Sequence, residues 1–120
     1  MERDMELVRE ILLVAEEAPA DDRHRTIRID GYSDALVGKH IELLRDAGYV
    51  EAELVRTETH GTVSGRVLRI TWAGYEFLDA ARSETVWNRA RQQVGDKLGS
   101  VPVEVLKQLL VRLSVNALGL

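Results

Sequence analysis

Residues 33–50, SDALVGKHIELLRDAGYV, decide the fold of this chain, because they predict one amphipathic helix followed directly by a strand. Ser33 suits the N-cap, since its hydroxyl can accept a hydrogen bond from a free N–H of the first turn. Gly48 suits the C-terminal position at which the backbone turns left-handed. At 100° per residue, one broad arc is apolar and should be buried. Its members are Leu36, Val37, His40, Ile41, Leu43, Leu44 and Ala47.

The opposite arc of this helix is a candidate recognition surface for nucleic acid. Lys39 and Arg45 can contact phosphates or bases, and Gly38 leaves its backbone bare for close approach. Three acids on the same arc would repel a phosphate backbone. They are Asp34, Glu42 and Asp46. An ordinary solvated helix face is therefore the alternative.

The remaining periodicity predicts a mainly α-helical fold with a small antiparallel sheet. Helices are expected at residues 2–18, 72–82, 83–98 and 103–117, and strands at residues 25–30, 49–57 and 66–72. Pro19 should end the first helix, and Gly99 should end the helix that begins at Ser83. Thr71 should cap the helix of residues 72–82. A helical arm over residues 83–120 would then follow a first domain over residues 1–82.

The last two strands should form a hairpin around a glycine-containing loop, residues 58–65. This hairpin looks basic, because Arg56, His60, Arg66 and Arg69 oppose only Glu58. A basic hairpin can follow a phosphate backbone or enter a minor groove. The alternative is an exposed hairpin with solubilising arginines.

The C-terminal helix is apolar on two sides. A core face is expected from Leu106, Leu109, Leu110, Leu113 and Ala117, and a second, narrower stripe comes from Val111, Val115 and Leu118. Because a surface helix needs only one apolar face, the second stripe indicates burial against another chain. The alternative is a terminal helix that packs in a groove or frays. The predicted dimer interface comprises Leu106, Leu110, Val111, Leu113, Val115 and Leu118.

Little in the sequence points to catalysis, a metal or a cofactor. His40 lies on the apolar arc and is expected to be a packed histidine with a backbone hydrogen bond. The three histidines lack metal-site spacing, and no nucleophile elbow or phosphate-binding glycine loop is present. Trp72, Tyr75 and Trp87 are expected in the core. The chain is therefore predicted not to be an enzyme.

Composition sets further bounds. The net charge of −4 argues mildly against a nucleic-acid binder. This charge is unevenly distributed along the chain. Residues 1–22 hold eight acids and two bases, whereas residues 23–120 carry a net charge of +2. No apolar run reaches membrane-spanning length, and there is no cysteine for a disulfide or a thiolate metal site. A soluble cytoplasmic protein is the expectation.

Two runs, residues 40–50 and 68–78, resemble the recognition-helix ending and the passage from wing to helix in winged-helix bacterial regulators. The whole chain resembles a family of small bacterial and prophage proteins called domain of unknown function 2513. That pattern is matched by residues 3–13, 31–33 with His40, 71–80, 85–88 and 99–102. The resemblance implies a winged-helix fold and a mobile-element setting, and no established biochemical activity. The short helix that usually precedes the recognition helix has no room here, so either the loop of residues 19–24 supplies a rudimentary turn or the fold is a reduced version.

Two functions remain open at this point. The first is a small winged-helix DNA-binding protein, such as a prophage-type transcriptional regulator, whose C-terminal arm makes a dimer. The second is a non-catalytic protein-interaction module on the same scaffold, for example a phage-encoded protein that binds a host or defence protein.

Overall fold

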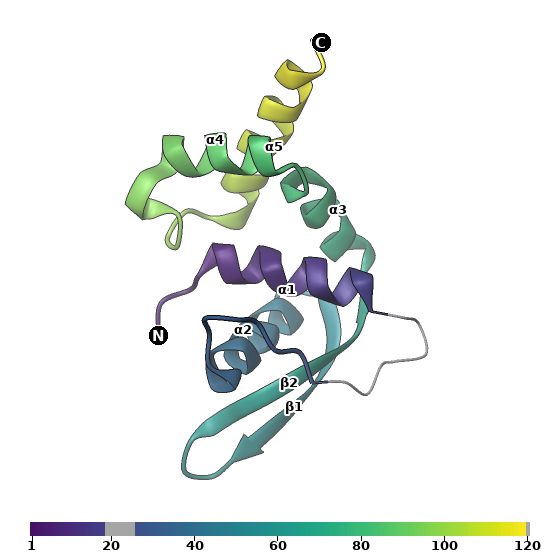
Figure 1. Cartoon of the computed structure of the whole chain (residues 1–120), viewed down its shortest axis with the longest axis vertical. Coiled ribbons are helices and arrows are strands. Elements are labelled where there is room, and N and C mark those ends of the chain that lie inside the picture. The colour runs from purple at the N-terminus through teal and green to yellow at the C-terminus, as the bar shows by residue number, and fades with distance from the viewer. Residues whose placement is uncertain (19–25, 120) are drawn as a thin grey trace.

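The structure, a computed structural model, describes residues 1–18 and 26–119, which form five α-helices, one 3₁₀-helix and a two-stranded antiparallel sheet (Figure 1). In chain order the elements are α1 (Met5–Glu17), α2 (Asp34–Asp46), β1 (Val50–Thr57), β2 (Gly61–Ile70), α3 (Trp72–Ala81), α4 (Glu84–Val94), η1 (Gly95–Lys97) and α5 (Val103–Ala117). The predicted class, mainly α-helical with a small antiparallel sheet, is confirmed. The hairpin extends from one end of the molecule, and the C-terminal half of α5 projects from the other (Figure 1).

The predicted end signals of α2 hold. Ser33 Oγ accepts a hydrogen bond from the Leu36 N–H at 3.1 Å, and Gly48 has a φ of 78°. Four members of the apolar arc are buried, namely Val37, His40, Ile41 and Leu44. Leu36 and Leu43 are half-buried and Ala47 is exposed. Local signals therefore fixed both ends of this helix correctly.

His40 is a packed structural histidine, as predicted. It is fully buried, its Nε2 accepts from the Asp4 N–H at 2.8 Å, and its Nδ1 lies 2.9 Å from the Leu36 carbonyl oxygen. Since Nε2 accepts, the ring proton belongs on Nδ1, which donates to Leu36. Asp4 also caps α1 through the Leu7 N–H. The histidine thus ties the start of α1 to α2.

The hairpin is longer than predicted. β1 pairs antiparallel with β2 from Val50 opposite Ile70 to Thr57 opposite Gly61, so the loop is only residues 58–60 and not 58–65. Gly61 closes the turn with a φ of 65°, a left-handed conformation that suits glycine. Ser64 and Gly65, which had indicated a loop, lie inside β2.

α2 packs closely on β2 at Gly38 and Gly65. A Cβ on Gly38 would lie 2.8 Å from backbone atoms of Ser64, and a Cβ on Gly65 would lie 3.3 Å from Ile41. Gly38 is therefore buried and does not lie on an exposed arc, so its expected close approach is to β2. Glycine has no side chain whose polarity could indicate this direction.

The strand predicted at residues 25–30 is wrong for the described part, because residues 26–30 have no regular secondary structure; Arg25 and the expected helix stop at Pro19 lie outside the described residues. The inward and outward alternation does hold, since Ile27 is buried, Arg28 is exposed and Ile29 is half-buried. The Ile27 N–H donates to the Gly65 carbonyl at 3.2 Å. This segment thus touches β2 without extending the sheet.

α3, α4 and α5 follow the hairpin much as predicted. Thr71 caps α3 by accepting from the Gly74 N–H at 3.2 Å, and α5 spans the expected residues. The second helix of the arm ends earlier than expected, at Val94 and not near Gly99. Gly95 has a φ of 65°, which stops α4 and begins η1.

Buried polar contacts join α1 to α3 and α4. Arg9, only 7% exposed, donates from Nε to the Ala81 carbonyl at 2.7 Å, and its guanidinium lies 5.6 Å from the centre of the Trp87 ring. It also donates to the Arg82 carbonyl at 3.0 Å, so it satisfies carbonyls at the end of α3. Trp87 Nε1 donates to Glu6 at 3.0 Å.

One apolar core includes residues from both sides of the predicted domain boundary at residue 83. Leu7 and Ile11 of α1 belong to the same buried cluster as Trp87 of α4 and Leu106 and Leu110 of α5. The division into residues 1–82 and 83–120 remains a prediction, but the two parts share their hydrophobic interior.

Two of the three aromatic residues expected in the core are on the surface. Trp87 is 1% exposed, as predicted, whereas Trp72 is 83% and Tyr75 is 41% exposed. α3 buries the face that carries Gly74, Phe77, Leu78 and Ala81. Trp72 and Tyr75 consequently lie outside that face.

Candidate functional site

The predicted nucleic-acid residues divide between two sides of the hairpin. Leu54 faces α2, because a Cβ on Gly65 would meet both Leu54 and Ile41. Neighbouring positions on a strand point to opposite faces, so Glu51 and Glu53 point away from α2. Their cross-strand partners, Arg69 and Arg66, therefore lie on the reverse side of the hairpin from α2.

Each hairpin arginine is paired with an acid. Arg69 lies 2.9 Å from Glu51, and Arg66 binds Glu53 directly across the strands. Arg56 reaches across to Glu42 of α2. The expectation that these arginines oppose only Glu58 is therefore wrong, because Glu51 and Glu53 alternate onto the arginine side of β1.

Glu42 links α2 to the hairpin. One of its carboxylate oxygens binds Arg56, and the other accepts from the hydroxyl of the buried Thr62 at 2.8 Å. This acid was expected to repel phosphate from an exposed arc. In the structure it is a bridging residue whose charge is already matched by Arg56.

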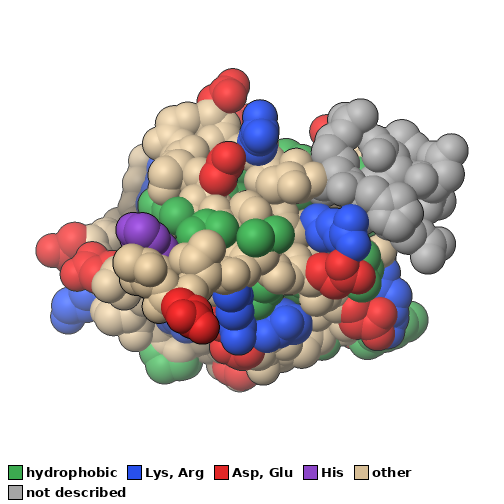
Figure 2. All heavy atoms as spheres, turned by 90° about the horizontal axis from the view of Figure 1, so that it is seen from below, with side chains coloured by type: hydrophobic (Ala, Val, Ile, Leu, Met, Phe, Trp, Pro, Cys, Tyr) green, Lys and Arg blue, Asp and Glu red, His purple; other side chains and the backbone are tan. Residues whose placement is uncertain are grey.

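Residues 34–70, called here the α2–hairpin region, carry acidic and basic side chains in similar numbers. The region holds six acids and five bases. Acidic and basic side chains intersperse on the face of the molecule in Figure 2, where they form no continuous basic patch. Hydrogen bonding to Arg69 lowers the pKa of Glu51, so this carboxylate stays charged beside its arginine at neutral pH.

Two predicted cations of α2 differ from the hairpin arginines. Lys39 is half-buried and Arg45 is exposed, and neither forms an ion pair within residues 1–18 and 26–119. His60 is exposed in the hairpin turn, where its backbone N–H donates to Thr57 Oγ1 at 3.0 Å. Gly38, buried against Ser64, has no surface to offer.

The predicted dimer residues also divide into two sets. Leu106, Leu110 and Leu113 are at most 8% exposed, so their place in a dimer interface does not fit the structure: they fill the chain's own core. Val111, Val115 and Leu118 are 46%, 39% and 74% exposed. The second stripe of α5 is therefore open to a partner.

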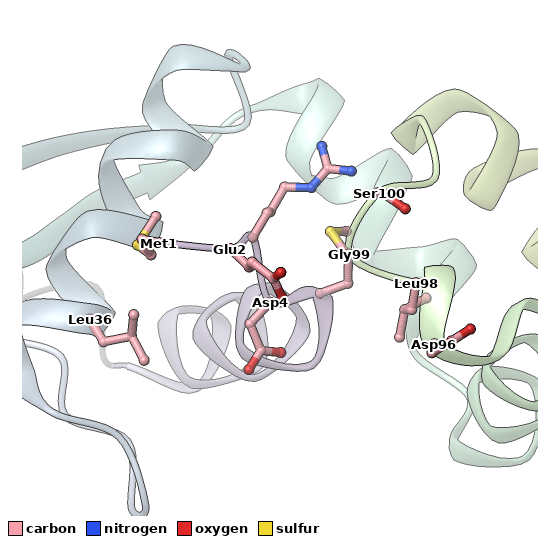
Figure 3. Close-up of a pocket in the computed structure, with 10 residues that line it drawn as sticks. Met1, Glu2, Asp4, Leu36, Asp96, Leu98, Gly99 and Ser100 are labelled. Atoms are coloured by element: carbon pink, nitrogen blue, oxygen red, sulfur yellow. The ribbon is translucent and has the colours of Figure 1, made fainter.

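Two surface pockets join segments that are far apart in the chain, which is why the sequence did not reveal them. The larger, of 690 Å³, has Met1 and Leu36 on one side and Asp96 and Leu98 on the other (Figure 3). The smaller, of 570 Å³, lies between α1 and residues 28–32.

One carboxylate in the lining of each pocket has a structural role. Asp4 caps α1 beside the larger pocket, and Glu6 of the smaller pocket binds both Trp87 and Arg91. Burial, together with the nearby Asp4 carboxylate, raises the pKa of Tyr32, so this phenol stays neutral in the smaller pocket. Neither pocket gathers a nucleophile with a matching base.

The described ranges, residues 1–18 and 26–119, contain no group of three His, Asp or Glu side chains placed to hold a metal ion. No helix within them has the length and apolar character needed to cross a bilayer.

Comparison with known proteins gives one family and one relative. A family model described as "Hypothetical protein (DUF2513)" matches residues 2–100. An uncharacterised protein of Haemophilus influenzae is 31% identical over 110 residues, which cover 91% of this chain and 92% of the relative. No solved structure matches the chain significantly.

Proposed function

The chain belongs to the DUF2513 family of hypothetical proteins, and we propose that it is a non-catalytic protein-interaction module on a winged-helix-like scaffold. The observation that carries this proposal is the pairing of Arg56, Arg66 and Arg69 with acids. Affinity for a nucleic-acid backbone comes chiefly from cations that neutralise phosphates. A region with six acids and five bases supplies no such excess, whereas protein interfaces accommodate mixed charge.

The outward side of α2 supports the same proposal. Leu43 is half-buried there, with Lys39 and the exposed Asp46 on the same side. Leu36 lies at the edge of this side, where it also packs against the core. Apolar side chains rimmed by charged ones are typical of protein-binding surfaces. We infer that this side of α2 contacts the partner.

DNA binding is the second candidate, and one observation favours it. Lys39 and Arg45 lack ion-pair partners among the described residues, and Arg56 lies beside α2 on the same side of the hairpin. Exposed ion pairs contribute little free energy, so Arg56 can exchange Glu42 for a phosphate. In this case α2 would enter the major groove as a recognition helix.

Fluorescence anisotropy of a random-sequence duplex, titrated with the protein at several salt concentrations, separates the two candidates. The interaction-module proposal expects no binding at tens of micromolar protein and low salt. Binding that weakens steeply with salt would overturn it. If such binding is lost in Lys39→Glu/Arg45→Glu but kept in Arg66→Glu/Arg69→Glu, the DNA contact lies on the α2 side.

A positive test uses a photo-crosslinking amino acid in place of Leu43, with the same group in place of the exposed Gln92 of α4 as a control. We expect a discrete crosslinked protein in producing cells from position 43 and not from position 92. Equal products at both positions, or none at position 43, would contradict a partner site on α2.

A further inference from the structure

The outer face of α5 carries more than the three-residue apolar stripe. Val105 is 55% exposed, and together with Val111 and Val115 it lies on an arc of about 120° opposite the buried leucines. The same arc carries the exposed polar residues Glu104, Gln108 and Arg112. This whole arc is here called the α5 outer face.

The charges on the α5 outer face have no ion-pair partner among the described residues. Glu104 and Arg112 are eight residues apart, so their Cα atoms are separated by about 12 Å along the helix, too far for a direct pair. No ion pair is formed by either side chain with the rest of residues 1–18 and 26–119. An acid and a base thus lie at opposite ends of one apolar face.

The α5 outer face is complementary to a second copy of itself that runs in the opposite direction. We propose that the α5 outer face binds the α5 outer face of a second copy of this chain, antiparallel, with the twofold axis at Gln108. Glu104 of each copy then lies opposite Arg112 of the other, and Val105 lies opposite Val111. Gln108 meets its own copy, where two amides can exchange hydrogen bonds. This self-association is independent of any partner bound at α2.

Other arrangements of two α5 helices lack this complementarity. Parallel helices in register place Glu104 beside Glu104 and Arg112 beside Arg112, which is repulsive. An antiparallel pair centred on Val111 places Glu104 opposite the apolar Leu118. Only the pairing about Gln108 matches both charges and both valines in the same register.

The interface is small, so the dimer should be concentration-dependent. One helix face of this length covers less area than the roughly 800 Å² per partner of a standard interface. We expect a dissociation constant in the micromolar range. Reversible association of this kind is measured by sedimentation equilibrium over a series of loading concentrations.

The experiment compares the wild-type protein, Glu104→Arg, Arg112→Glu and the double variant Glu104→Arg/Arg112→Glu. Each single change places like charges opposite each other at two symmetric positions, and we expect it to weaken association roughly tenfold or more. The double variant restores opposite charges in reversed order and should return to within about threefold of wild type. Arg45→Glu, the same charge change on exposed α2, should leave association unchanged.

Circular dichroism melts on the same samples check that every variant is folded. We expect all of them to fold, because the altered side chains are exposed. A wild-type protein that stays monomeric up to hundreds of micromolar would overturn the proposal. It would equally fail if the double variant associates no better than the single ones, or if Arg45→Glu weakens association as much as Arg112→Glu.

Discussion

At the scale of single residues, Tyr49 gives the clearest pH dependence. Its side chain is 9% exposed and its ring stacks on Phe77 with centroids 5.7 Å apart. Burial raises the pKa of Tyr49, and the nearby Glu104 carboxylate adds to the shift. The folded state thus favours the neutral phenol, and its contribution to stability is complete below the unfolded pKa, about 10.

We expect the free energy of unfolding to fall as the pH rises above about 10, because the unfolded chain releases the Tyr49 proton more readily. Urea denaturation between pH 8 and pH 11 measures this decline. Tyr49→Phe keeps the ring and removes the titrating group, so its decline should be shallower than that of wild type. An equal decline in both proteins would exclude Tyr49 as a source of the alkaline sensitivity.

At the scale of elements, the close contact of α2 with β2 depends on Gly38, which has no side chain. In an uncrowded helix, Gly38→Ala should stabilise by about 1 kcal/mol. Here the new Cβ would lie 2.8 Å from backbone atoms of Ser64, which cannot rotate away. We expect a net loss of about 1–2 kcal/mol in the free energy of unfolding by chemical denaturation. A stabilised variant would contradict the tight packing.

Elements could be predicted from sequence where the cause is local. The caps at Ser33 and Thr71 use residues within three positions of the helix start, so neighbouring residues are enough to identify them. The stop at Gly95 is also local, but Gly99, four residues later, was predicted to end this helix. The extent of β2 was missed because Ser64 and Gly65 locally indicate a loop, whereas Gly65 lies in the strand against Ile41 of α2, which is distant in the chain.

The candidate site was harder to predict than the fold. The arginines of the hairpin were identified correctly as exposed or half-exposed cations, but their pairing depends on strand register. Register placed Glu53 opposite Arg66 and Glu51 opposite Arg69. The outward position of Trp72 depended on which face of α3 meets the core. Such choices are made by the tertiary packing, and residue type alone does not indicate them.

At the scale of the whole molecule, the shared core predicts that the C-terminal helices and the N-terminal helices unfold together. Leu110 of α5 is fully buried in the cluster that includes α1. Leu110→Ala should cost about 2–5 kcal/mol and shift one cooperative transition. Val111→Ala, next to it but exposed, should change the free energy of unfolding by less than about 0.5 kcal/mol.

The measurement is urea unfolding followed by far-ultraviolet circular dichroism and by tryptophan fluorescence, to which the buried Trp87 contributes. Coincident transitions from the two probes are expected for wild type and for both variants. Two separated transitions would mean that residues 83–120 form an independently stable unit.

The contacts of the N-terminal segment also determine when it can finish folding during protein synthesis. Arg3 donates to the Val101 carbonyl at 2.7 Å, and Glu6 binds Trp87 and Arg91, so the first helix completes its packing only with the last ones. At 5–20 residues per second, a ribosome needs roughly 5–20 s to deliver those partners after α1 emerges. During that interval the side of α1 that packs against α4 is uncovered. The net charge of −6 on residues 1–22 disfavours close association of two such segments during that interval.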